Sequence, residues 1–186
     1  MANRKLAVIC PGIGYHADKP LLYYAAKLAK AQGCEILSVT YCDMPQKIRG
    51  DLGMMRDAAA RAYAQTEAKL AAYDPAGYEE VLLIGKSIGT IAAAMYNAEH
   101  SLRARQILYT PLDETFSFIS PGSSCIAFVG DADPWSEIRK LQKSADAKQI
   151  PLSVYSGCNH SLESGDILRD ITILEDVMQK TAQFIQ

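Results

Sequence analysis

The chain has 186 residues, with 19 Lys and Arg against 21 Asp and Glu, a formal net charge of −2, and 49% of it is apolar. This size is typical of one globular domain that needs no disulfides. Because basic residues are not in excess, a nucleic-acid partner is not expected, and no apolar run approaches the ~20 residues of a membrane-spanning helix. The five cysteines lack metal-binding spacing, and no secretion signal is present, so we expect a cytoplasmic protein with reduced thiols and no metal or other cofactor.

Short apolar runs alternate with amphipathic or helix-forming stretches along the chain. The expected strands are 6–10, 35–41, 81–84, 106–109, 125–129 and 152–155. The expected helices are 19–32, 52–73, 87–99, 134–148 and a last one from about residue 166 to the end. Continuously apolar strands separated by helices predict parallel pairing with right-handed crossovers. The pattern therefore predicts an α/β fold: an open, doubly wound, six-stranded parallel sheet with helices on both faces, in one domain over residues 1–186.

One connection is shorter than the others. Between the fourth and fifth expected strands lie only residues 110–124, with prolines at positions 111 and 121. This stretch can hold a short turn of helix at most, and no other connection is long enough for a cap domain. We therefore expect an open, shallow site that accepts small or flexible substrates.

The third expected strand is followed by Gly85-Lys86-Ser87-Ile88-Gly89, a G-x-S-x-G sequence that opens a helix-forming run. A nucleophile elbow occurs in this strand–turn–helix setting, with its serine lifted clear of the sheet. The N–H of Ile88, at the helix N-terminus, would then face a developing oxyanion. The alternative is a glycine-rich turn in which Ser87 only caps the helix.

A nucleophilic serine needs a histidine base and an orienting carboxylate. Two histidines follow expected strands, His16 after the first and His160 after the sixth, and Asp133 follows the fifth. Because the carboxyl ends of parallel strands share one edge of the sheet, these residues should lie near Ser87. Taken singly, Asp133 could cap a helix and His160 could be a polar loop residue, and Asp131 is a rival carboxylate. The chain order Ser87, Asp133, His160 is the one found in α/β-hydrolases.

With these motifs, the sequence resembles the α/β-hydrolase superfamily, and most of all its small, lidless serine esterases related to dienelactone hydrolases. The resemblance runs from Leu6 to the last helix and is carried by residues 85–89, 130–134 and 157–162. It implies that Ser87 is the nucleophile, His160 the general base and Asp133 its orienting partner. The oxyanion hole would combine the N–H of Ile88 with that of Ile13 or Gly14.

The sequence departs from the family pattern at three points. Pro11-Gly12 stands where many members have His-Gly, which leaves the choice between Ile13 and Gly14 open. Dienelactone hydrolases proper use cysteine at the position of Ser87, so that particular activity is not implied. The family core has about eight strands, and only six are expected here, which indicates that the first two are missing.

The resemblance implies hydrolysis of carboxylic esters through an acyl-enzyme, and the lack of a cap-sized insertion predicts small or flexible acyl groups. The same triad would serve a thioesterase or an acyltransferase, and a non-catalytic ligand-binding protein of this fold is the alternative from another class. The expected partner is a small ester or thioester, with neither nucleic acid nor membrane, and the sheet edges also allow a homodimer. The candidates for substrate contact are Tyr15, His16, Tyr109 and Trp135, and further rim candidates are Tyr41, Met44 and Phe116.

Overall fold

The computed structural model describes residues 4–186 and contains one six-stranded, fully parallel sheet in the order β2-β1-β3-β4-β5-β6. The strands are β1 (Lys5–Cys10), β2 (Cys34–Ser38), β3 (Glu80–Lys86), β4 (Arg105–Tyr109), β5 (Cys125–Gly130) and β6 (Leu152–Tyr155). The α-helices are α1 (Pro20–Ala31), α2 (Leu52–Leu70), α3 (Ile88–Glu99), α4 (Ile138–Lys148) and α5 (Ile167–Ile185). Two short 3₁₀ helices are η1 (Pro75–Gly77) and η2 (Asp113–Phe118). The doubly wound α/β sheet expected from the sequence is confirmed.

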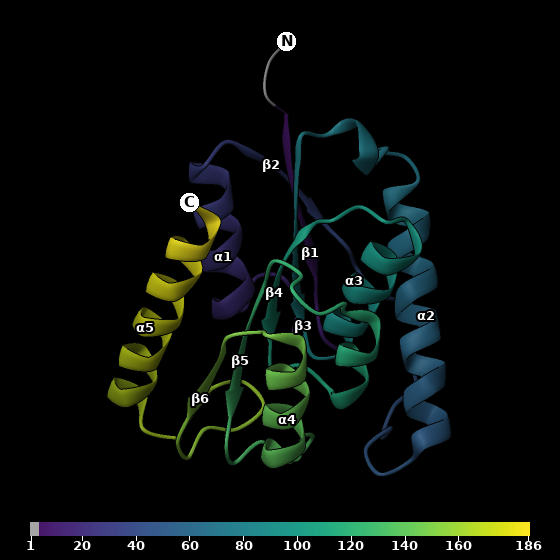
Figure 1. Ribbon diagram of the computed structural model, residues 1–186. Helices are drawn as coiled ribbons and strands as arrows, with labels where there is room; N and C mark the ends of the chain where they lie inside the picture. The colour runs from purple at the N-terminus through teal and green to yellow at the C-terminus, as the bar shows by residue number, and fades with distance from the viewer. Residues whose placement is uncertain (1–3) are drawn as a thin grey trace.

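Helices cover both faces of this sheet, with α1 and α5 on one side and α2, α3 and α4 on the other (Figure 1). Successive residues of the central strand β1 point to opposite faces. Ala7 and Ile9 pack with apolar residues of α1 and α5, whereas Leu6 and Val8 pack with residues that include Leu70 of α2. Burial on both faces explains why the strands are continuously apolar in sequence.

Some strands and helices are shorter than expected, because residues at their ends belong to the connecting loops and turns. Strand β2 ends at Ser38 rather than residue 41, although the N–H of Val39 still donates to the carbonyl of Ile9 at 2.9 Å. Helix α4 begins at Ile138 rather than residue 134, because the preceding residues form the turn around Asp133. The short connection after β4, expected to hold a short turn of helix at most, contains the six-residue 3₁₀ helix η2.

All six strands run in the same direction, so their carboxyl ends lie together at the lower edge of the molecule in Figure 1. No cap domain covers this edge in the part of the chain that the structure describes. Within residues 4–186, no helix is both long and apolar enough to cross a membrane.

Candidate active site

Ser87 occupies the turn between β3 and α3 in an unusual backbone conformation. Its φ of 55° and ψ of −124° lie where a residue with a side chain is strained, which is the geometry of a nucleophile elbow. Its N–H donates to the carbonyl of Tyr109 at 3.0 Å, and its carbonyl accepts from the hydroxyl of Thr90 at 2.6 Å. These hydrogen bonds hold the turn in place against the strain.

Three glycines make the close packing around this turn possible. A Cβ on Gly85 would lie 2.7 Å from Cα of Thr90, and one on Gly89 would overlap the main chain of Cys10 and Pro11. Gly12, in the loop after β1, approaches the serine so closely that a Cβ there would lie 3.2 Å from Ser87 Cβ. The β1 loop and the start of α3 are therefore pressed together directly beside Ser87.

Three side chains from three separate loops form a continuous hydrogen-bonded chain. Nε2 of His160 lies 2.8 Å from Oγ of Ser87, and Nδ1 of His160 lies 2.7 Å from Oδ2 of Asp133. The other carboxylate oxygen of Asp133 accepts the N–H of Trp135 at 2.9 Å. Because an ionised carboxylate can only accept, it favours the tautomer with the proton on Nδ1, which leaves Nε2 free to accept the serine proton.

The surroundings of His160 keep its imidazole unprotonated near neutral pH. Burial lowers its pKa below the ordinary 6.5, the hydrogen bond to Asp133 acts in the opposite direction, and the charge of Lys86 lowers it further. The Trp135 ring lies against the imidazole, with 5.6 Å between the ring centroids. A neutral imidazole beside the Ser87 hydroxyl is the form that acts as a general base.

Main-chain N–H groups without protein acceptors are found directly after Ser87 and in the loop after β1. Among residues 4–186, the N–H groups of Ile88, Ile13 and Gly14 have no protein acceptor. Ile88 begins α3, so its N–H belongs to the free positive end of that helix. Ile13 lines the same pocket as Ser87 and His160, whereas Gly14 is exposed and is not part of that pocket. Of the two residues considered from the sequence, only Ile13 is among the described lining residues of this pocket.

No family model matches the sequence, and no curated protein matches it. Solved structures do. An alpha-beta serine hydrolase homologue from Coxiella burnetii is 15% identical, with 96% of this chain and 85% of that chain covered at a TM-score of 0.69. An α/β serine hydrolase without a lid from Xanthomonas campestris is 15% identical over 96% of this chain and 81% of its own, at a TM-score of 0.62. The chain has the α/β-hydrolase fold. Est1E from Butyrivibrio proteoclasticus, at 10% identity and a TM-score of 0.70, covers 100% of this chain and 90% of its own.

In this hydrolase fold the serine and the histidine line a pocket of about 250 Å³. Its other walls come from the loop between β2 and α2, from Leu112 and from Trp135; the lining residues are Ile13, Pro45, Gln46, Lys47, Ile48, Arg49, Ser87, Ile88, Leu112, Trp135 and His160. Trp135 is a candidate from the sequence that lines this pocket, whereas residues 45–49 are not among the sequence-based candidates. The signal was available, because this stretch follows β2 and so belongs to the same edge of the sheet.

Other expected substrate contacts lie elsewhere. Tyr109 is fully buried in the core, where its hydroxyl lies 2.7 Å from Thr181 Oγ1 of α5, so its prediction as a substrate contact is wrong. Phe116 is buried as well. His16 has an exposed side chain with Nδ1 3.6 Å from an Asp18 oxygen, and it does not line the pocket of Ser87.

Tyr15, Tyr41 and Met44 are also absent from the lining of the Ser87 pocket. Tyr15 is buried, and its hydroxyl accepts the N–H of Leu21 in α1 at 3.1 Å. The Tyr41 hydroxyl lies 3.0 Å from Thr66 Oγ1. Side chains that follow a strand can thus turn toward the helices instead of the edge of the sheet, and the chain order does not distinguish the two.

Proposed function

We propose that this protein is a serine hydrolase that cleaves carboxylic esters of small or flexible acyl groups. The observation that carries the proposal is the hydrogen-bonded chain Ser87–His160–Asp133, with its serine at a strained turn and in an open pocket. The fold shared with serine hydrolase structures supports it. A pocket of about 250 Å³ without a cap suits a short acyl group rather than a long chain.

The geometry supports an acyl-enzyme mechanism. His160 accepts the Ser87 proton through Nε2 as Oγ attacks the ester carbonyl carbon, and the oxyanion forms beside the N–H groups of Ile88 and Ile13. His160 then gives the proton to the departing alcohol. Water attacks the acyl-enzyme by the same route, with His160 as base, and Ser87 is regenerated.

The test is labelling with a fluorophosphonate, followed by mapping of the adduct by mass spectrometry. We expect the adduct on Ser87, no labelling of Ser87→Ala, and normal labelling of Ser124→Ala, which changes an exposed serine. Ser87→Ala should also lose the hydrolysis of p-nitrophenyl acetate, whereas Ser124→Ala should keep it. Equal labelling of Ser87→Ala and the wild type would rule out Ser87 as the nucleophile.

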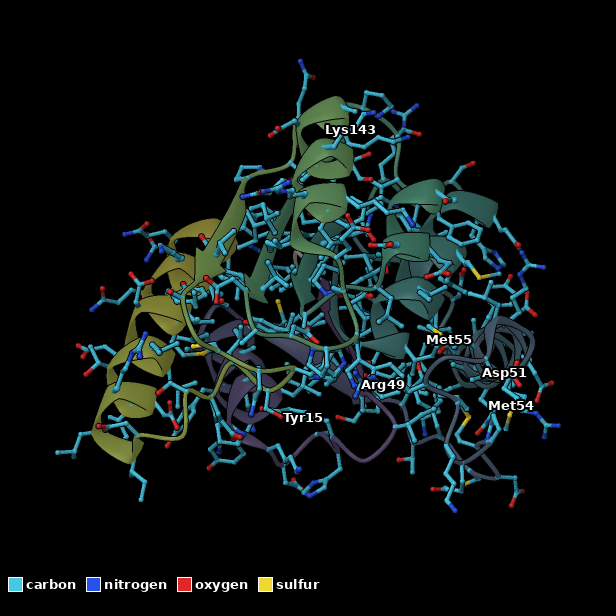
Figure 2. The ribbon with its side chains drawn as sticks, turned by 90° about the horizontal axis from the view of Figure 1, so that it is seen from below. Tyr15, Arg49, Asp51, Met54, Met55 and Lys143 are labelled. Carbon is cyan, nitrogen blue, oxygen red and sulfur yellow. The ribbon has the colours of Figure 1, made fainter. Side chains whose placement is uncertain are left out.

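The charged residues that line the pocket predict a preference among esters. They are Lys47 and Arg49, both exposed, and no acidic side chain is among the pocket's described lining residues. Figure 2 shows the molecule from below, and Arg49 lies near the middle of this view. An ester with a free carboxylate, such as a p-nitrophenyl hemisuccinate, should therefore have a lower KM than the neutral butyrate.

Arg49→Gln should raise KM for the hemisuccinate about five-fold, the value of one exposed ion pair, and leave KM for the butyrate unchanged. High salt should reduce the same preference. Arg139→Gln, an exposed change on α4, serves as the matched control. An equal rise in KM for both esters would contradict a charge effect.

A further inference from the structure

Lys86 is a lysine in a place where lysines are rarely found. It is the last residue of β3, directly before Ser87, and only 2% of it is exposed. Its aliphatic stem runs beneath the loop after β1, since a Cβ on Gly12 would lie 3.4 Å from its Cδ. Packing alone would be satisfied by an apolar side chain of this length.

The ammonium of Lys86 has few partners for a buried charge. Nζ donates to the main-chain carbonyl of His160 at 2.7 Å and lies 5.0 Å from the centre of the Tyr15 ring. Among residues 4–186 it has no other hydrogen-bond acceptor, and no carboxylate oxygen lies within 4.0 Å. Burial of an ammonium without an ion pair is costly. Accordingly, burial lowers the pKa of Lys86 from 10.5 to about 7.

The one hydrogen bond of Nζ reaches the residue whose ring joins Ser87 to Asp133. The main chain of His160 lies in a loop of the β6–α5 connection, and its position decides whether Nε2 lies within reach of Oγ. The bond from Lys86 ties this loop to β3, the strand that carries the nucleophile. Ser87 and the His160 loop are thereby both held by β3, although 73 positions separate the two residues in the chain.

We propose that Lys86 is a positioning residue for His160, which fixes the histidine loop through its main-chain carbonyl and places a buried positive charge beside it. The inference rests on the proposed function, because it assigns Lys86 a part in the same triad. Lys86 does not touch the reacting atoms and is not a catalytic residue.

Several charged groups face this pair and define its electrostatics. Asp133 favours the charged form of both His160 and Lys86, and Glu163 of the β6–α5 connection favours that of Lys86. Lys19, just before α1, opposes the charge of Lys86. Tyr15 stays neutral, because burial raises its pKa to about 12. The exposed Lys47 and Arg49 share the pocket with His160. Against this background, loss of the Lys86 charge should raise the pKa of His160.

The experiment compares the rate of fluorophosphonate labelling as a function of pH in wild type, Lys86→Met and Lys27→Met. Methionine keeps the length and apolar volume of the stem without donor or charge. Lys27 is an exposed lysine near the ring of Tyr23, at 5.3 Å, and is the matched control. For Lys86→Met we expect labelling about ten-fold slower and the midpoint of the acid limb moved to higher pH, whereas Lys27→Met should behave as the wild type.

A folded Lys86→Met protein whose acid limb keeps the wild-type midpoint would overturn the proposal, whatever its rate. If the wild type itself is not labelled, the proposed function fails instead, so the two failures are distinguishable.

The second measurement, on the wild type, does not depend on the folding of a variant. NMR titration of His160 should show its own step and a second inflection near neutral pH, when Lys86 loses its proton. A single His160 step would likewise overturn the proposal.

Discussion

Asp133→Asn is expected to lower kcat for ester hydrolysis about 10³–10⁴-fold, with little change in KM. The Asp133 carboxylate accepts from Nδ1 of His160 at 2.7 Å and from the N–H of Trp135 at 2.9 Å. With asparagine, the amide oxygen can keep the bond to Trp135, and the amide NH₂ then faces Nδ1. The imidazole would turn to the tautomer with its proton on Nε2, which cannot accept the proton of Ser87. Steady-state hydrolysis of p-nitrophenyl acetate measures the effect.

Asp131→Asn is the control. From the sequence alone, Asp131 is the other candidate for the carboxylate that orients His160, but its surroundings differ from those of Asp133. It is exposed, and its side chain accepts the N–H of Gly157 rather than a proton of His160. Its replacement should leave kcat within about two-fold of the wild type, the range of a surface substitution. A loss in Asp131→Asn equal to that in Asp133→Asn would show that the assignment of the orienting carboxylate is wrong.

The sheet and the triad geometry follow from features that are local in sequence. Apolar runs such as Val81–Ile84 have the composition of strands buried on both faces, and the helices between them make a parallel order necessary. Once the strands are parallel, the residues that follow them share one edge. This is why Ser87, Asp133 and His160 could be placed together before any distance was known.

The rest of the site depends on side-chain direction and long-range packing, which the chain order does not encode. Tyr109 is the last residue of β4, at the correct edge, yet its side chain enters the core toward α5 because the sheet face there is covered. Lys86 precedes Ser87 in sequence, but the role proposed for it depends on a carbonyl 74 positions away. A lysine in an otherwise apolar strand was the visible signal. Its partner was not predictable without the fold.

Gly89→Ala is expected to destabilise the protein by about 3 kcal/mol or more, the upper range for overpacking a tight interior. A Cβ at this position would overlap the carbonyl of Cys10 and that of Pro11. Neither obstacle is a side chain that can rotate away, since both belong to the main chain where β1 leaves the sheet. To make room, the β1 loop and the start of α3 must separate, although β1 is paired on both sides. Urea unfolding followed by circular dichroism measures the loss.

Gly33→Ala separates this overlap from the general cost of losing a glycine. Gly33 has a φ of 84° and nothing within 4 Å of a Cβ, so only backbone strain, about 1 kcal/mol, should result. The two variants should also differ in function. Movement of the β1 loop shifts Ile13 away from Ser87 and slows fluorophosphonate labelling in Gly89→Ala, whereas Gly33→Ala should label at the wild-type rate. Equal stability losses in the two variants would mean that the β1 loop and α3 are not in the close contact from which the oxyanion site is built.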